Sequence, residues 1–539
     1  MKARLFALAM LFSLAACSSI PTSGPVIFHP LPTESAGSGV LVAALPPAPG
    51  ASKLEIVEGF LHASGIYEEG YATARLYLAR GTSWHPESKV SVFSSGSLQD
   101  PFAEKDGDIV LSATLVGSVD ARGTFAPEGA AAEHAFGLVK EDGEWRISAP
   151  PDGLLVSRQQ FDRGWESAEV YYMGLNGRLV PEPVVIPKSD DKLERVVKRQ
   201  LRGPNAWLQP TVVSRPTLSL RSVTLANAIA EITLEPSSLD LMELREAVAA
   251  ELVATASSLP GIRGVQVRVG ETLLTLSGLS GPTYTRADVA PLLESDAQLY
   301  LSNGRQVYSP GSGYTVAAGQ VSVFAAYEEQ RFVTVLTDSE LLQYSTDELQ
   351  MGYSGLGEGS VQQLEYGPTG VLWALQEGRL YRESDNALLE PVQTPIGSAK
   401  SEVMAFSIAA DGERMAALVD TGKGAQLGFF LISDGVLSSW RELATNTQGN
   451  LGVCFMDDDK LLLLSERTDG GRTLTQTTTD GAWVSDMVPP ESGRIARIAC
   501  SPGQAPVALT DEGVAYAYDS VAGKWNSVGE KVLGVGYSK

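Results

Sequence analysis

The feature of this sequence that most constrains its fold is a β-hairpin pattern repeated along the C-terminal part. Each copy has a short apolar strand, a polar turn and a second strand that often carries tyrosine. Equivalent residues of the six first strands are spaced by 35, 39, 44, 45 and 45 residues, and they are Leu301, Leu336, Leu375, Val419, Leu464 and Leu509. This spacing is the period of four-stranded propeller blades. We therefore expect residues 291–539 to form an all-β propeller with six blades.

Each of the last five hairpins is preceded by one more apolar strand, which would be the inner strand of its blade. These strands are 321–325, 361–366, 403–409, 452–455 and 495–500. The first hairpin has no such strand before it, whereas residues 532–537 read as an inner strand with no hairpin after them. Pairing the last strand with the first hairpin would close the ring and remove two exposed sheet edges. An open β-sandwich, the alternative, does not explain why the missing strand occurs at residues 532–537.

The N-terminus has the pattern of a lipoprotein signal peptide. Two basic residues precede an apolar run from Leu5 to Leu14, too short to span a bilayer, and Ala15, Ala16 and Cys17 follow. We expect residues 1–16 to be removed and Cys17 to become an N-palmitoyl, S-diacylglycerol cysteine. The alternative is an ordinary signal peptide, cut after Ala16, in which Cys17 has no special role.

Residues 17–50 contain seven prolines, together with serine and glycine, and this composition favours a semi-extended tether over a packed core. The tether begins at residues 17–25 with Cys-Ser-Ser-Ile-Pro-Thr-Ser-Gly-Pro. This run resembles the start of the mature actinobacterial LpqB lipoproteins. The resemblance implies a lipid anchor, an N-terminal α+β domain, a GerMN domain and a C-terminal propeller.

Residues 51–166 show helical periodicity over 54–61 and 71–78, followed by alternating strands. Helices that lead into a curved antiparallel sheet suggest a small α+β cone of the nuclear-transport-factor-2-like type. Because such cones have an open mouth, His62, His85 and His134 are candidate site residues. None has a carboxylate at motif spacing, so we favour structural or surface roles for all three.

Residues 167–290 read as strand, helix, hairpin, helix and strand. A strand at 169–173 precedes a predicted turn at Leu179–Glu182, and a helix over 191–201 has Asp191 and Glu194 as a plausible capping box. A hairpin around residues 226–227, a helix over 241–257 and a strand over 265–269 follow. This order resembles the GerMN domain of spore-germination and envelope proteins, which implies a binding or assembly module. Pro183 stands where that family usually has a basic residue, which argues against a polar ligand site at the turn.

Three further patterns have structural and functional interpretations. Ser189 and Lys192 match the Ser-x-x-Lys spacing of penicillin-binding enzymes, but the other elements of such enzymes are missing from the sequence. Residues 457–459 are three consecutive aspartates, for which we favour a solvated turn over a calcium site. Cys454 and Cys500 lie at matching places in adjacent inner strands, and we favour two free thiols over a disulfide.

The charge and the histidine content of the sequence argue against several classes of function. Loss of the two basic residues of the signal peptide takes the formal charge from −23 to −25, which argues against a nucleic-acid ligand. No histidine follows His134, so the propeller has no histidine-based metal site or catalytic triad. We therefore expect a non-enzymatic protein with no catalytic residues, no metal and no cofactor.

The resemblance to LpqB implies a role in signalling at the outer face of the plasma membrane. It implies that the chain binds the extracellular part of the MtrB sensor histidine kinase and modulates MtrAB two-component signalling, with effects on envelope and division. A carbohydrate or peptidoglycan sensor is an alternative, in which tryptophans would stack on sugars. We favour core roles for those tryptophans, which are Trp373, Trp440, Trp483 and Trp525. A propeller hydrolase is a weaker alternative.

Overall fold

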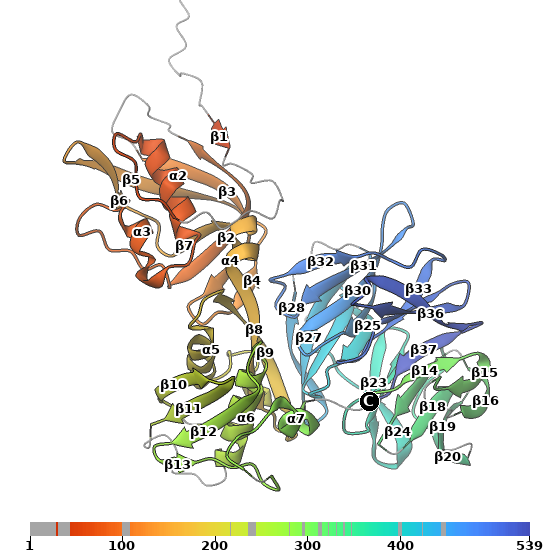
Figure 1. The fold of residues 1–539 in the computed structure, drawn as a ribbon. Coiled ribbons are helices and arrows are strands. Elements are labelled where there is room, and N and C mark those ends of the chain that lie inside the picture. The colour runs from red at the N-terminus through yellow and green to blue at the C-terminus, as the bar shows by residue number, and fades with distance from the viewer. Residues whose placement is uncertain are drawn as a thin grey trace, which may run out of the picture. The chain divides into compact units, whose positions relative to one another are not determined.

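The structure is a computed structural model, and its contacts group the chain into two compact units (Figure 1). The smaller unit comprises residues 1–116 and 129–163, and the larger unit comprises residues 117–128 and 164–539. The residues that the structure describes are 28–30, 44–99, 108–215, 217–235, 244–279, 281–293, 297–310, 315–321, 323–329, 331–337, 340–345, 348–396, 401–422, 424–443 and 449–539.

The smaller unit is built on an antiparallel sheet of order β1-β2-β3-β5-β6, with β7 added parallel to β2. Its strands are β1 (Phe28–Pro30), β2 (Lys89–Gln99), β3 (Ile109–Asp120), β5 (Ala131–Glu141), β6 (Glu144–Ala149) and β7 (Leu154–Ser157). Past Val116, β3 continues into the larger unit and pairs there with β4 (Phe125–Pro127). Helix α4 (Arg158–Gly164) follows β7.

Helix α2 (Lys53–Ser64) covers part of the core of the smaller unit. Its N-terminus is fixed by a capping box, in which the Ser52 hydroxyl accepts from the Glu55 N–H and the Glu55 carboxylate accepts from the Ser52 N–H. Its apolar residues are buried, as the helical periodicity predicts. The second predicted helix is much shorter than 71–78. Only η1 (Glu69–Tyr71) and α3 (Ala72–Arg75) form, and Tyr71, with a left-handed φ of 54°, separates the two.

The GerMN-like part of the larger unit contains a long hairpin and a four-stranded sheet. The hairpin is β8 (Trp165–Met173) with β9 (Leu179–Pro187), and the sheet has the order β10-β11-β12-β13. The parallel pair β11–β12 is connected through α6, whose residues 248–256 are all buried in the core. The elements are α5 (Lys192–Leu201), η2 (Gln209–Thr211), β10 (Leu220–Ala226), β11 (Ile229–Leu234), α6 (Arg245–Ser257), β12 (Gly264–Val269), β13 (Thr272–Leu273), α7 (Arg286–Val289) and η5 (Ala290–Leu292).

Two local predictions for this region are wrong. Residues 179–182 begin strand β9 and do not form a turn, because the reversal occurs earlier, at Gly174–Arg178. Asp191 does not cap α5 with its side chain; its carboxylate instead pairs with Arg195 and accepts from the Ser189 hydroxyl. Near the predicted hairpin turn, Asn227 and Ala228 have φ of 52° and 63°, as a two-residue β-hairpin loop requires.

The C-terminal part forms a propeller in which the described residues make six four-stranded sheets. In order from the inner strand these are β37 (Gly534–Tyr537), β14 (Leu299–Ser302), β15 (Gly304–Tyr308), β16 (Thr315–Val321); β17 (Phe324–Tyr327), β18 (Phe332–Leu336), β19 (Leu341–Ser345), β20 (Glu348–Tyr353); β21 (Val361–Tyr366), β22 (Leu372–Gln376), β23 (Arg379–Ser384), β24 (Leu388–Pro391); β25 (Glu402–Ile408), β26 (Arg414–Asp420), β27 (Ala425–Ser433), β28 (Val436–Glu442); β29 (Asn450–Phe455), β30 (Lys460–Glu466), β31 (Arg472–Thr478), β32 (Val484–Met487); and β33 (Ile495–Ala499), β34 (Val507–Thr510), β35 (Val514–Asp519), β36 (Lys524–Glu530). Helix η6 (Asp385–Ala387) joins β23 to β24.

The predicted closure of the propeller is confirmed. Strand β37 pairs antiparallel with β14, with Val535 opposite Leu301 (Figure 1). The last strand of the sequence therefore supplies the inner strand of the first blade.

Helices long and apolar enough to cross a bilayer do not occur in the part of the chain that the structure describes.

Candidate functional site

The central channel of the propeller contains a cavity with a volume of about 310 Å³. Residues from all six inner strands line it, so it lies on the axis of the ring. A cavity built from several strands whose backbones are fixed by their own sheets is a preorganised place for a ligand. We therefore treat this channel as the candidate site.

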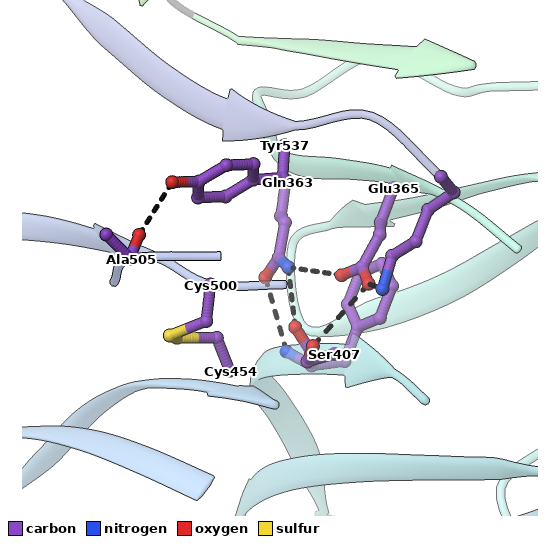
Figure 2. The surroundings of a disulfide bond; sticks show 9 residues. Gln363, Glu365, Ser407, Cys454, Cys500, Ala505 and Tyr537 are labelled. Atoms are coloured by element: carbon purple, nitrogen blue, oxygen red, sulfur yellow. Dashed lines mark hydrogen bonds and ion pairs between the residues drawn. A yellow bond between two sulfur atoms is a disulfide. The ribbon is translucent and has the colours of Figure 1, made fainter. Parts of the chain in front are cut away.

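The polar part of the channel is a network around Glu365, which lies on β21 (Figure 2). Lys539 Nζ lies 3.0 Å from Glu365 Oε1 and also donates to the Ile408 carbonyl oxygen over 2.7 Å. The Ile408 N–H donates to Glu365 Oε1 over 2.9 Å. The Lys539 side chain is 6% exposed, so the network is an almost fully buried ion pair with further hydrogen bonds.

The Gln363 amide connects two neighbouring inner strands. Its Nε2 donates to the Phe406 carbonyl oxygen over 2.6 Å, and its Oε1 accepts from the Phe406 N–H over 3.2 Å (Figure 2). This two-point contact fixes β21 against β25 along the channel wall.

The other part of the channel is its mouth, which is shaped by β-bulges. Four inner strands shift register by one residue against the next strand of their blade, and the extra residues are Gln362, Met404, Leu451 and Ala496. All four line the channel. Bulges commonly re-aim side chains next to binding sites. Met404 and Leu451 are 47% and 39% exposed, which shows that the mouth is open to solvent.

Cys454 and Cys500 form a disulfide on the channel wall, so the expectation of two free thiols is wrong (Figure 2). Their Cα atoms are 5.5 Å apart, inside the normal disulfide range. Inner strands approach one another closely at the propeller axis, where Cys454 lies on β29 and Cys500 directly follows β33. Neighbouring blades therefore do not diverge too far for pairing. The bond joins the blade of β29 to the blade of β33.

A second candidate region is the junction between the GerMN-like part and the propeller, both of which belong to the larger unit. The Trp207 ring packs against the Arg441 guanidinium at 4.2 Å, and its Nε1 donates to the Ser439 carbonyl oxygen over 2.9 Å. In the turn between β8 and β9, the Asn176 side chain donates to the Asp411 carbonyl oxygen and its N–H donates to the Glu413 carboxylate. These contacts join the two parts through both aromatic and polar groups.

The aspartates at 457–459 belong to this junction, so their prediction as a solvated turn is wrong for two of the three. Asp458 is 7% and Asp459 is 3% exposed, whereas the Asp457 side chain is half-exposed. Asp458 Oδ2 lies 3.0 Å from Tyr171 Oη and 3.2 Å from Arg286 Nη2. Partners from β8 and α7, distant in sequence, therefore cover these carboxylates. Within the described residues, no cluster of three or more metal-ligating side chains is found.

The junction carboxyl groups have raised pKa values. Burial, together with the charges of Asp459 and Asp458, raises the pKa of Glu169 to about 8. Burial and the neighbouring Asp457 raise the pKa of Asp458 to about 6, against the opposing effect of Arg286. Tyr171 Oη contacts both Glu169 and Asp458, yet a hydroxyl has one proton to donate. Both contacts are satisfied when one carboxyl group is protonated and donates to Tyr171 Oη, while the Tyr171 hydroxyl donates to the other carboxylate.

These raised pKa values predict that the larger unit loses stability as the pH rises. A carboxyl group whose pKa is higher in the folded than in the unfolded state favours folding below its unfolded pKa, and this contribution is lost as the pH rises through the folded value. For Glu169 and Asp458 this window runs from about pH 4 to about pH 8. We expect the thermal midpoint to fall by several degrees between about pH 6 and about pH 9.

Thermal unfolding of the Glu169→Gln variant checks this prediction, because the amide keeps the shape of the side chain without titrating. Its midpoint should depend less on pH than that of the wild type. Glu235→Gln, which alters an exposed ion pair with Arg221, is the matched control and should keep the wild-type pH dependence. Identical pH profiles for Glu169→Gln and the wild type would show that the junction does not titrate.

The three candidate histidines lie in different elements of the smaller unit. His62 lies in the last turn of α2, and His134 lies on β5, where burial lowers its pKa. His85 Nδ1 is 3.3 Å from Asp152 Oδ1, a carboxylate 67 residues away in sequence, and both side chains are exposed. An exposed pair of this kind fits the surface role that we favoured.

The remaining predicted site residues have mixed outcomes. Cys17 lies outside the described residues, and its lipidation stays a prediction. Trp373 is buried in the propeller core, as expected. Trp440 and Trp525 are half-buried and pack on Phe430 and Tyr518. Lys192 pairs with Glu166 at 3.2 Å, consistent with a structural role for the Ser-x-x-Lys pattern.

Comparison with known proteins finds two family models side by side on this chain. "Lipoprotein LpqB, N-terminal domain" matches residues 46–162, and "Sporulation and spore germination" matches residues 169–275. The Lipoprotein LpqB of Cutibacterium acnes is 24% identical over 97% of this chain and 96% of its own length. The Lipoprotein LpqB of Thermobifida fusca is 26% identical over 72% of this chain and 69% of its own length. Among solved structures, a putative TolB from Agrobacterium tumefaciens covers 44% of this chain and 89% of its own, at 13% identity and a TM-score of 0.33.

Fold and comparisons together define a modular protein with two small α+β domains and a C-terminal propeller. The propeller and the GerMN-like part share an extensive junction. Within that class, the chain is similar to the LpqB lipoproteins along nearly its whole length.

Proposed function

We propose that this chain is a non-enzymatic binding lipoprotein, held by lipid on Cys17 at the outer face of the plasma membrane. There it binds the extracellular part of an MtrB-like sensor histidine kinase and modulates MtrAB signalling, with effects on cell envelope and division. The observation that carries this proposal is the relationship to lipoproteins of the LpqB family along nearly the whole chain. The lipoprotein pattern around Cys17 supports the same role.

The physics of anchoring supports binding to a membrane partner. Each buried CH₂ group of the lipid contributes about 0.8 kcal/mol, so two or three acyl chains hold the protein at the membrane. A partner in the same membrane then meets the chain at a high effective concentration, and a modest intrinsic affinity suffices. The junction supports a role in transmission, because its buried contacts couple the GerMN-like part to the propeller.

Crosslinking and affinity capture from membranes of the native host would test this function. The wild-type chain should recover the sensor kinase, with crosslinks to the kinase's extracellular part. The Cys17→Ala variant should recover about tenfold less kinase, because it loses the shared membrane. Both proteins should bind the purified extracellular part of the kinase in solution with the same affinity. Failure of either protein to bind it would reject the kinase as partner, whereas equal capture from membranes would reject the role of the anchor.

A further inference from the structure

The mouth of the propeller channel exposes apolar side chains that a ligand could cover. Met404 and Leu451 are large apolar residues at equivalent bulges of neighbouring blades, and both remain substantially exposed beside the 310 Å³ cavity. Covering such surface with an apolar group is favourable by about 25 cal/mol per Å². The cavity volume is at the lower end of the range of small-molecule sites. The space therefore suits a small ligand with an apolar portion.

The charged side chains of the channel indicate the polar end of such a ligand. The acidic side chain that lines the channel is Glu365, and its charge is neutralised by Lys539 at 3.0 Å. The other charged side chain in the lining is Arg497, which lies on β33 next to the bulge at Ala496. A guanidinium has five N–H donors and binds carboxylates through two parallel hydrogen bonds. Arg497 can therefore donate to an anion while its other N–H groups keep their contacts within the protein.

The walls around these groups are held in place independently of any ligand. The Cys454–Cys500 disulfide and the two hydrogen bonds of the Gln363 amide each join neighbouring inner strands. A wall fixed in advance lowers the entropic cost of binding.

We propose that the channel binds a small amphiphilic carboxylate, a molecule of roughly a dozen non-hydrogen atoms with one acidic group and a short apolar portion. The carboxylate binds Arg497, and the apolar portion lies against Met404 and Leu451 in the mouth.

Titration calorimetry on the full mature chain, carrying Cys17→Ala for solubility, tests this proposal with three probes of one shape. Phenylbutyrate carries the carboxylate, phenylbutanol is neutral, and phenylbutylamine is a cation. Phenylbutyrate should bind one site at least about tenfold more tightly than the other two, because a hydrogen bond to a charged group is lost in the alcohol. Equal affinities for all three, or no heat with phenylbutyrate up to millimolar concentration, overturn the proposal.

Two variants locate the site. Arg497→Gln should weaken phenylbutyrate binding about tenfold or more without changing the affinity for phenylbutanol. Leu451→Glu should weaken binding of both, because it places a carboxylate in the apolar mouth. Arg467→Gln is the matched control; Arg467 pairs with Asp469 on the outer hairpin of the same propeller and is 64% exposed. Wild-type affinity for phenylbutyrate in Arg497→Gln, or an equal loss in Arg467→Gln, places the binding elsewhere and rejects the proposed site.

Discussion

Replacing Arg199 with methionine is expected to destabilise the larger unit by about 3–5 kcal/mol, because it leaves a buried carboxylate without its charge partner. Arg199 and Glu182 form an ion pair whose side chains are only 5% and 3% exposed. Arg199 also donates to Tyr172 Oη and to the Gly203 carbonyl oxygen, and Glu182 accepts from the Asn205 N–H. The pair thus joins β9, α5 and the loop that follows α5.

Equilibrium unfolding in urea would measure this loss. Lys198→Met is the matched control, since Lys198 is the adjacent residue of α5 but is 56% exposed in its pair with Glu194. Its stability should change by less than about 1 kcal/mol. The double variant Glu182→Gln with Arg199→Met should recover part of the loss, because the remaining side chain carries no charge. Equal losses of stability in Arg199→Met and Lys198→Met would mean that the buried ion pair contributes no more to stability than the exposed one.

Loss of the Cys454–Cys500 disulfide is expected to lower the stability of the propeller by about 2–4 kcal/mol. The two cysteines are 46 residues apart, and closing a loop of this length restricts the unfolded chain considerably. The double variant Cys454→Ala with Cys500→Ala, in a Cys17→Ala background, should therefore unfold at lower urea concentration than the disulfide-bonded chain.

A reducing agent gives the control for this experiment. It should lower the stability of the disulfide-bonded chain to nearly that of the double variant and should leave the double variant unchanged. The number of thiols that react with a thiol reagent under denaturing conditions, before and after reduction, verifies the bond directly. Two reactive thiols in the unreduced, air-exposed chain would contradict the presence of the bond.

The propeller was predictable because its signal is repetitive. Each hairpin repeats the same order of apolar strand, polar turn and second strand. A blade that lacks its inner strand can be completed only by a strand from elsewhere in the chain. Pairing of β37 with β14 follows from that pattern. Helix α5 and the strands around it were likewise readable from periodicity.

The site details were not predictable, because they depend on contacts between distant segments. Nothing near Asp458 in the sequence indicates that Tyr171 and Arg286 will cover it, so three consecutive acids read as a solvated turn. The bulges that aim Met404 and Leu451 into the channel are shifts in register, which leave apolar alternation almost unchanged. The disulfide was misjudged because the separation of inner strands at the axis is a property of the closed ring.

Sequence reasoning also missed Glu365, Lys539 and Arg497 as lining residues of one cavity. The positions of Glu365 and Arg497 on inner strands were available from the repeat, and aligning the six inner strands by blade would have brought these two residues to the same channel. The pairing of Lys539 with Glu365 has no local signal, since it joins the strand at 534–537 to a different blade.

The pairing of β37 with β14 has a consequence for the order in which the chain can fold. Around this strand pair, the Gln298 N–H donates to the Ser538 hydroxyl across a sequence separation of 240 residues. A chain that is synthesised from its N-terminus can therefore complete five blades before the first one is finished. Until then the edge of β14 is open to other strands, and the long-range closure makes this step slow. The time between emergence of residue 299 and of residue 537 is thus the period in which this protein most needs protection from aggregation.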